Sequence, residues 1–182
     1  MYRAVTLEAL NRAVDLENPD SYNFLDEITI TYENDKIFLN GKSVGREIRS
    51  TRVADNVSTV AKMAVVRHKM VELQQKAAEH GKIIMDGRDI GYVVLPNADV
   101  KIFLTASVEE RARRRFLENQ ASGKQETYEE ILESIIARDY KDSNRDLNPL
   151  RQASDAILLD TTNMNIEQVV LEIVRIIKER LN

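Results

Sequence analysis

The sequence contains no cysteine, which excludes a disulfide-stapled scaffold and any metal site built from thiolates. It contains only two histidines, His68 and His80, and neither has a partner at metal-site or triad spacing, so we expect both on the surface. No apolar run approaches the length of a membrane span, and the residues after Met1 lack the apolar core of a signal peptide. These absences predict a cytoplasmic protein without a membrane partner.

An excess of positive charge is also missing. Lysine and arginine number 26 against 30 aspartates and glutamates, which gives a net charge of −4. This balance argues against nucleic acid as a partner, so an anionic ligand has to be held by individually placed arginines. A length of 182 residues with 43% hydrophobic content predicts one globular domain, residues 1–182, with room for a small insert.

The stretch 82–89 organises the chain. It is a short apolar run, Lys82-Ile83-Ile84-Met85, that ends abruptly in Asp86-Gly87-Arg88-Asp89. Such a run is typical of a parallel strand covered on both faces, and open α/β sheets bind ligands beyond the carboxyl ends of such strands. We therefore predict a strand over residues 82–85 and a charged-ligand site directly after it.

The first half of the chain otherwise predicts helices and a small sheet. Residues 1–14 have helical spacing, although no side chain is placed to cap the helix at its start. Short alternating runs over 28–44, bounded by Asn and Gly, predict an antiparallel meander. Residues 51–80 read as a helix that allows a break near Met63, with Gly81 closing it.

The second half alternates strands and helices. We predict strands over 100–104 and 156–159, and helices that begin with capping boxes at Ser107 and Thr127, the second ending near Arg145. A final helix should face the core through Ile166, Val169, Val170, Ile173, Ile176 and Ile177. This order predicts an α/β fold with a parallel sheet and helices on its faces.

Three groups of charged residues could carry chemistry. In the first, Asp86 is placed to hold Mg²⁺ through water, and Arg88 can grip a phosphate with paired N–H donors. The alternative is a surface turn with an ion pair. We favour the functional interpretation because two acids and an arginine directly follow a buried strand.

The second group is Arg138, Asp142 and Arg145, whose spacing of four and then three residues places them on one helix face. On its own this pattern is typical of a solvated salt-bridge pair. Taken alone, we favour that interpretation; the functional alternative is that two guanidinium groups flanking a carboxylate bind a phosphate and a ribose hydroxyl together.

The third group is the arginine run from Arg111 to Arg115. It could form a lid over transferring phosphates, or simply pair with neighbouring glutamates. Three further residues, Arg3, Ser58 and Arg67, would each be assigned to the surface if taken alone.

Taken together, these residues resemble the bacterial cytidylate kinase family of nucleoside monophosphate kinases over nearly the whole chain. The resemblance rests on the following motifs: Met1-Tyr2-Arg3-Ala4, Ser58, Val66-Arg67, the run from Asp86-Gly87-Arg88-Asp89 to Leu95-Pro96, Glu110-Arg111-Ala112-Arg113-Arg114-Arg115, and Arg138-Asp139 with Asp142, Arg145, Pro149 and Leu150. The motif beginning at Asp86 is highly specific, whereas the arginine run is not.

The resemblance implies a transferase, a kinase of pyrimidine nucleotide metabolism that moves the γ-phosphoryl group of ATP to CMP or dCMP with Mg²⁺. It implies the following roles: cytosine contacts for Ser58, Arg67 and Asp89, ribose contacts for Arg138 and Asp142, phosphate contacts for Arg3, Arg88 and Arg145, magnesium support for Asp86, and lid positions for Arg111 and Arg115. It also implies an insert over about 21–50, a lid over about 107–145, and a monomer.

One departure from the family is serious. The six glycines include no Gly-x-x-x-x-Gly-Lys-[Ser/Thr] spacing, so the 182 residues lack a phosphate loop. We therefore expect a P-loop-kinase-type, three-layer α/β fold without its first strand and phosphate loop. The hypothesis is a chain shortened at its N-terminus that is inactive as given and leaves a gap in its sheet. The rivals are a non-catalytic CMP-binding or regulatory protein and a purely structural domain.

Overall fold

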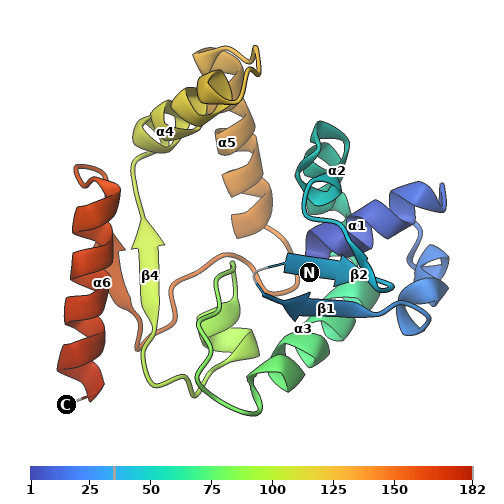
Figure 1. Ribbon diagram of the computed structural model, residues 1–182, viewed down its shortest axis with the longest axis horizontal. Helices are drawn as coiled ribbons and strands as arrows, with labels where there is room; N and C mark the ends of the chain where they lie inside the picture. Colours follow the sequence, from blue (N-terminus) through green and yellow to red (C-terminus); the bar gives the residue numbers. More distant parts are fainter. Residues whose placement is uncertain (35, 182) are drawn as a thin grey trace. The chain divides into compact units, whose positions relative to one another are not determined.

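The computed structural model describes residues 1–34 and 36–181 (Figure 1). The chain divides into two compact units, Met1–Ile83 and Ile84–Asn182. The predicted turn at 33–36 includes Asp35, which lies outside the described residues. No helix among the described residues is long and apolar enough to cross a membrane.

The first unit is helical with a small sheet. Its elements are α1 (Tyr2–Asn11), η1 (Pro19–Asp26), β1 (Ile30–Glu33), β2 (Lys36–Leu39), β3 (Lys42–Ser43), η2 (Glu47–Arg49), α2 (Thr51–Lys62) and α3 (Ala64–Ala78). The three strands pair antiparallel in sequence order, which confirms the predicted meander. The start of α1 has no side-chain cap, also as predicted.

The helix predicted over residues 51–80 is broken at Met63, where the sequence analysis allowed a break. Met63 has φ −65° and ψ 123°, an extended conformation that ends α2 and begins α3. The core of this unit packs the buried faces of α1, α2 and α3 against Tyr22, Phe24 and Leu25 of η1. A second cluster joins α1 and α2 to the small sheet through Leu7, Leu39, Val44 and Val53.

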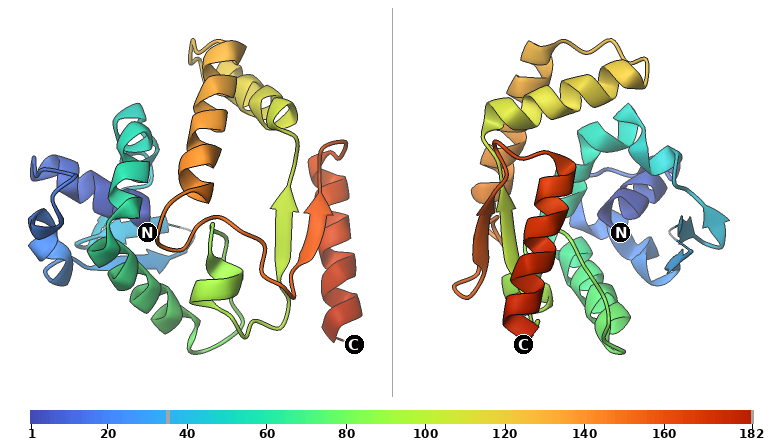
Figure 2. Two further views of the ribbon diagram at one scale, coloured as in Figure 1. Left: turned by 180° about the vertical axis from the view of Figure 1, so that it is seen from behind. Right: turned by 60° about the vertical axis from the view of Figure 1, so that its left-hand side comes forward.

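The second unit contains the elements η3 (Ile90–Val94), β4 (Ile102–Thr105), α4 (Val108–Ala121), α5 (Tyr128–Ser143), β5 (Ile157–Asp160) and α6 (Ile166–Leu181). Strands β4 and β5 pair in parallel, with Ile102 opposite Ile157 and Thr105 opposite Asp160. Helix α6 runs alongside this pair in both views of Figure 2. Helices α4 and α5 pack on each other through Ala112, Ile131 and Ile135. The chain is therefore of the mixed α/β class.

Residues 82–85 do not form the predicted strand. They run without a sheet partner, and the Ile84 side chain is 95% exposed. An extended segment becomes a strand only when a neighbouring backbone pairs with it, and the described residues supply none. Both the strand and its burial were therefore predicted wrongly, because Ile83 is 41% exposed as well.

The predicted core face of α6 is also only partly correct. Ile176 is buried at 3% exposure, but Ile166 is 80% exposed and Val170 54%. The two parallel strands do not cover both of these positions. Leu104 and Leu158, on opposite faces of the β4–β5 pair, are exposed as well. Apolar residues on both faces are typical of a parallel sheet that is covered on both sides, and this two-stranded sheet is not.

Candidate functional site

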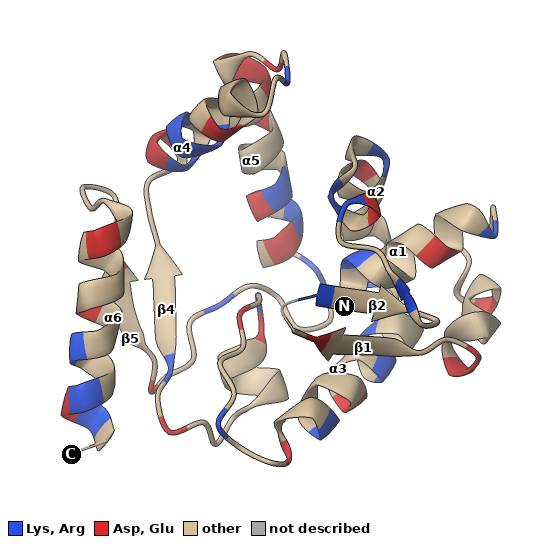
Figure 3. Ribbon diagram, viewed as in Figure 1, with Lys and Arg blue, Asp and Glu red and all other residues tan. Residues whose placement is uncertain are grey.

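The centre of the site in the second unit is Asp142, on the last turn of α5. Asp142 is 7% exposed, and its carboxylate faces three guanidinium groups. Arg88 Nε lies 3.1 Å from Oδ2, Arg138 Nε lies 3.7 Å from the same oxygen, and Arg145 Nη1 lies 3.8 Å from Oδ1. Figure 3 shows acidic and basic residues alternating along this end of α5. The cluster therefore holds one negative and three positive charges.

This charge balance suits an anion. The Arg88 and Arg138 side chains are 41% and 37% exposed, so both can reach a ligand while touching Asp142. Arg145 is more buried, at 9%, and its Nε donates to the Asn148 carbonyl oxygen at 2.6 Å. Paired guanidinium groups recognise phosphate oxygens strongly, because their N–H donors match the spacing of the oxygens. The predicted helix face is correct for Arg138 and Asp142 only, because α5 ends at Ser143 and Arg145 lies beyond its C-cap Asn144.

Arg88 reaches this face from the segment 86–89. In that segment Asp86 and Arg88 are exposed, whereas Asp89 is buried at 4% exposure. The segment leads into η3, a single π-helical turn, a form often found at functional sites. A Cβ atom added at Gly87 would lie 2.8 Å from Ile90 Cγ1, so this position accepts glycine best.

The arginine run on α4 divides into different roles. Arg114 is structural, because it donates to the Thr161 and Met164 carbonyl oxygens at 2.5 and 3.1 Å. Arg113 and Arg114 both bind Glu110 at 2.8 Å, and these hydrogen bonds lower the pKa of that carboxyl to about 2. Ser107 caps the helix as predicted, but the second half of its capping box is not formed, because Glu110 is engaged by the arginines.

The two arginines expected in a lid differ in their contacts. Arg111 is held at both ends: its Nη2 lies 2.7 Å from Asp139 Oδ2 on α5, and its Nε donates to the Ala106 carbonyl oxygen at 3.1 Å. Within residues 1–34 and 36–181, no hydrogen bond or ion pair is found for the half-buried Arg115. The Arg115 side chain is therefore open to a ligand, whereas Arg111 would have to give up its ion pair with Asp139 to bind one.

The first unit holds Arg3, Ser58 and Arg67. Arg3 Nη1 donates to the Ile48 carbonyl oxygen at 2.9 Å, and Ser58 lies half-buried on α2. Arg67 is 1% exposed, donates to the Ala61 carbonyl oxygen at 3.1 Å, and places its guanidinium 5.4 Å from the centre of the Tyr2 ring. A surface assignment for Arg67 is therefore wrong, because η1 and the neighbouring helices enclose this part of α3.

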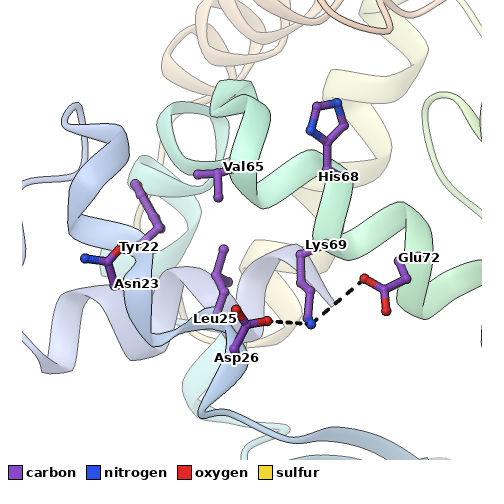
Figure 4. A pocket seen from close by; sticks show the side chains of 8 residues that line it. All are labelled: Tyr22, Asn23, Leu25, Asp26, Val65, His68, Lys69 and Glu72. Atoms are coloured by element: carbon purple, nitrogen blue, oxygen red, sulfur yellow. Dashed lines mark hydrogen bonds and ion pairs between the residues drawn. The ribbon is translucent and has the colours of Figure 1, made fainter.

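A shallow pocket of the first unit contains none of the predicted residues. Figure 4 shows its lining: Tyr22, Asn23, Leu25, Asp26, Val65, His68, Lys69 and Glu72. Its one lysine, Lys69, already binds Asp26 at 2.7 Å and lies 3.9 Å from Glu72. His68 is exposed, as predicted. The pocket lining has two carboxylates, Asp26 and Glu72, against one lysine, so it offers no excess positive charge to a phosphate.

Sequence reasoning missed Asp139 and Tyr92. Asp139 holds Arg111, and the Tyr92 hydroxyl donates to the Pro149 carbonyl oxygen. Both residues stand inside the quoted motifs, but their partners are distant in the sequence, so spacing alone gave no signal for either contact.

Comparison with known proteins gives one consistent result. The family model described as cytidylate kinase matches residues 1–179. The cytidylate kinase of Limosilactobacillus fermentum is 52% identical over 186 residues, covering 100% of this chain and 82% of that protein. The cytidylate kinase of Acholeplasma laidlawii is 48% identical over 178 residues, covering 98% and 80%. That of Bacillus cytotoxicus is 47% identical over 186 residues, covering 100% and 83%.

The chain therefore spans about four fifths of the length of these relatives. The matches include both units and every charged group described above. On this basis the chain belongs to the cytidylate kinase family, and it is a kinase-type phosphotransferase.

Proposed function

We propose that this chain builds the acceptor half of a kinase that transfers the γ-phosphoryl group of ATP to CMP or dCMP, giving CDP or dCDP and ADP. The observation that carries the proposal is the cluster of Arg88, Arg138 and Arg145 around the buried Asp142. Phosphoryl transfer depends on positioning and on cations around the moving group, and this cluster supplies both.

The roles proposed for single residues follow the family resemblance. In the second unit, Arg88 and Arg145 take the monophosphate, Arg138 and Asp142 the ribose, and Asp89 the cytosine. Arg111 and Arg115, in the lid region of about 107–145, take the charge that develops on the transferred group. In the first unit, Ser58 and Arg67 take the cytosine and Arg3 the phosphate. We propose that both units belong to one kinase domain.

Magnesium is part of the proposal. Residues 1–34 and 36–181 contain no cluster of three or more metal-ligating side chains, but Asp86 is exposed directly after the apolar run 82–85. Mg²⁺ keeps several waters and uses one or two carboxylates together with substrate phosphates, so a single carboxylate fits this ion. When bound, the ion would neutralise charge on the phosphates of ATP.

We also propose that the 182 residues by themselves do not transfer a phosphoryl group. They hold no phosphate loop, and hence no backbone cradle, lysine or hydroxyl for ATP and its metal. The fold we propose is that of a P-loop kinase, a three-layer α/β sandwich, with its first strand and phosphate loop outside these residues. We propose a monomer that acts in the cytoplasm, because its substrates are intracellular nucleotides.

A coupled assay of ADP release tests the proposal, with CMP, dCMP, UMP and AMP as acceptors. The 182-residue chain should release no ADP. The same chain joined to the strand and phosphate loop of a related kinase should release ADP with CMP or dCMP, and far less with UMP or AMP. Equal rates with all four acceptors would contradict the proposed substrate.

A non-catalytic CMP-binding or regulatory protein is the second candidate, and the missing phosphate-loop motif favours it. It predicts that CMP binds and that no ADP is released even after the phosphate loop is supplied. A purely structural domain would bind no nucleotide, and Arg138→Ala would then change stability alone.

A further inference from the structure

Tyr92 joins two segments that flank the Asp142 cluster. It lies in the π turn η3, and its hydroxyl donates to the carbonyl oxygen of Pro149, in the connection between α5 and β5. The guanidinium of Arg151, in the same connection, lies 4.4 Å from the centre of the Tyr92 ring, within the range of a cation–π contact. One side chain therefore contacts this connection with both its polar and its aromatic parts.

Backbone packing brings the same two segments together. A Cβ atom added at Gly91 would lie 3.6 Å from Ala153 Cβ and 3.5 Å from Lys101 Cδ, which is ordinary van der Waals contact. Lys101 in turn binds Asp155 at 2.7 Å. The turn and the connection thus touch at several points, and Tyr92 provides the hydroxyl bond between them.

The connection is fixed to α5 at its other end. The Leu150 amide donates to the Asp142 carbonyl oxygen at 2.7 Å, and Arg145 Nε donates to the Asn148 carbonyl oxygen at 2.6 Å. Pro149 lies between these two anchors. The bond from Tyr92 to Pro149 therefore ties η3 to the end of α5 that carries Asp142 and to the start of the connection that carries Arg145.

Arg88 stands two residues before η3, and its Nε lies 3.1 Å from Asp142 Oδ2. We propose that Tyr92 is a positioning residue that holds Arg88 against Asp142, where its guanidinium meets the phosphate of the acceptor nucleotide. This inference rests on the proposed function. It assigns to Tyr92 no contact with substrate, and it predicts an effect confined to ligands that carry a phosphate.

The test is Tyr92→Phe, which removes only the hydroxyl and keeps the ring under Arg151. Tyr140→Phe, at a tyrosine that is 69% exposed, is the matched control. Calorimetry should show CMP affinity reduced about two- to tenfold by Tyr92→Phe, as expected for the loss of one hydrogen bond. Affinity for cytidine, which lacks the phosphate, should not change. Tyr140→Phe should change neither affinity.

Two results would overturn the inference. An equal loss for CMP and cytidine would show a structural role without positioning of Arg88, and unchanged CMP affinity would show no role. If the unsubstituted chain binds no CMP, the proposed function fails, and the Arg88 Nε–H signal in nuclear magnetic resonance decides the inference without a ligand. That signal should shift in Tyr92→Phe and stay in place in Tyr140→Phe; an unshifted signal in both would overturn the inference.

Discussion

At the scale of single residues, Asp142 is the one on which the account depends. Its spacing from Arg138 and Arg145 predicted a shared helix face, but the same spacing also suited a solvated ion pair. Asp142 is 7% exposed and faces Arg88 as a third partner, so the pair is not solvated, and ligand binding by the cluster stays a prediction. The approach of Arg88 could not be predicted from helix periodicity, since it depends on how a loop more than fifty residues away folds back.

Asp142→Asn removes the carboxylate that the three guanidinium groups of the cluster share. Arg145 is nearly buried and would lose its ion pair with Asp142, so the free energy of unfolding should fall by about 1–3 kcal/mol. Urea denaturation followed by circular dichroism measures this change.

Glu179→Gln is the control for Asp142→Asn. Glu179 is paired with Arg175 at 2.6 Å, but its side chain is 60% exposed, so its removal should cost less than about 1 kcal/mol. Equal effects of the two substitutions would show that the Asp142 cluster is an ordinary surface network.

At the scale of elements, local signals predicted most of the helices and the small sheet. The Thr127 capping box is present with both of its hydrogen bonds, and Met63 breaks the long helix. The sequence could not show that residues 82–85 form no strand, because pairing with a distant backbone decides whether an apolar run becomes a strand. The prediction that α6 buries its apolar face was only partly correct for a similar reason. The periodicity of the sequence indicates which side of the helix is apolar, but not whether another segment covers that side.

Helix α4 should respond to acid through Glu110. Its pKa is lowered from 4.5 to about 2, chiefly by the hydrogen bond from Arg113 and then by that from Arg114. A lowered folded-state pKa gives stability that is present above the unfolded pKa and lost as the pH falls toward the folded pKa. The contribution should therefore disappear between pH 4.5 and about 2.

Glu110→Gln isolates this effect, because glutamine keeps the shape of the side chain without the titrating group. The stability difference between the two proteins should be largest above pH 4.5 and shrink toward pH 2 in thermal unfolding. A difference that stays constant over this interval would show that the Arg113 and Arg114 contacts to Glu110 do not contribute.

At the scale of the whole molecule, composition excluded more than it specified. It excluded disulfides, thiolate metal sites and a strongly basic surface, whereas the family resemblance supplied the function. The described residues expose an unusual amount of apolar surface in the second unit, including Ile84, Ile166 and Leu171 at 95%, 80% and 69%. Exposed side chains of this size suit burial against another segment.

The exposed face of α6 should bind a hydrophobic dye. The folded chain should increase the fluorescence of anilinonaphthalene sulfonate, and Ile166→Gln combined with Leu171→Gln should reduce this signal without loss of helix content. Glu167→Gln, on the same turn of α6, is the control. An unchanged signal in the double variant would show that α6 is covered in solution.

The central claim is that these 182 residues build the acceptor-nucleotide half of a kinase and lack the half that grips ATP. Calorimetric titration of the unsubstituted chain with CMP, and separately with ATP and Mg²⁺, tests it most directly. The account predicts weak but measurable binding of CMP and no measurable binding of ATP. Tight, Mg²⁺-dependent binding of ATP, or the absence of any binding of CMP, would contradict it.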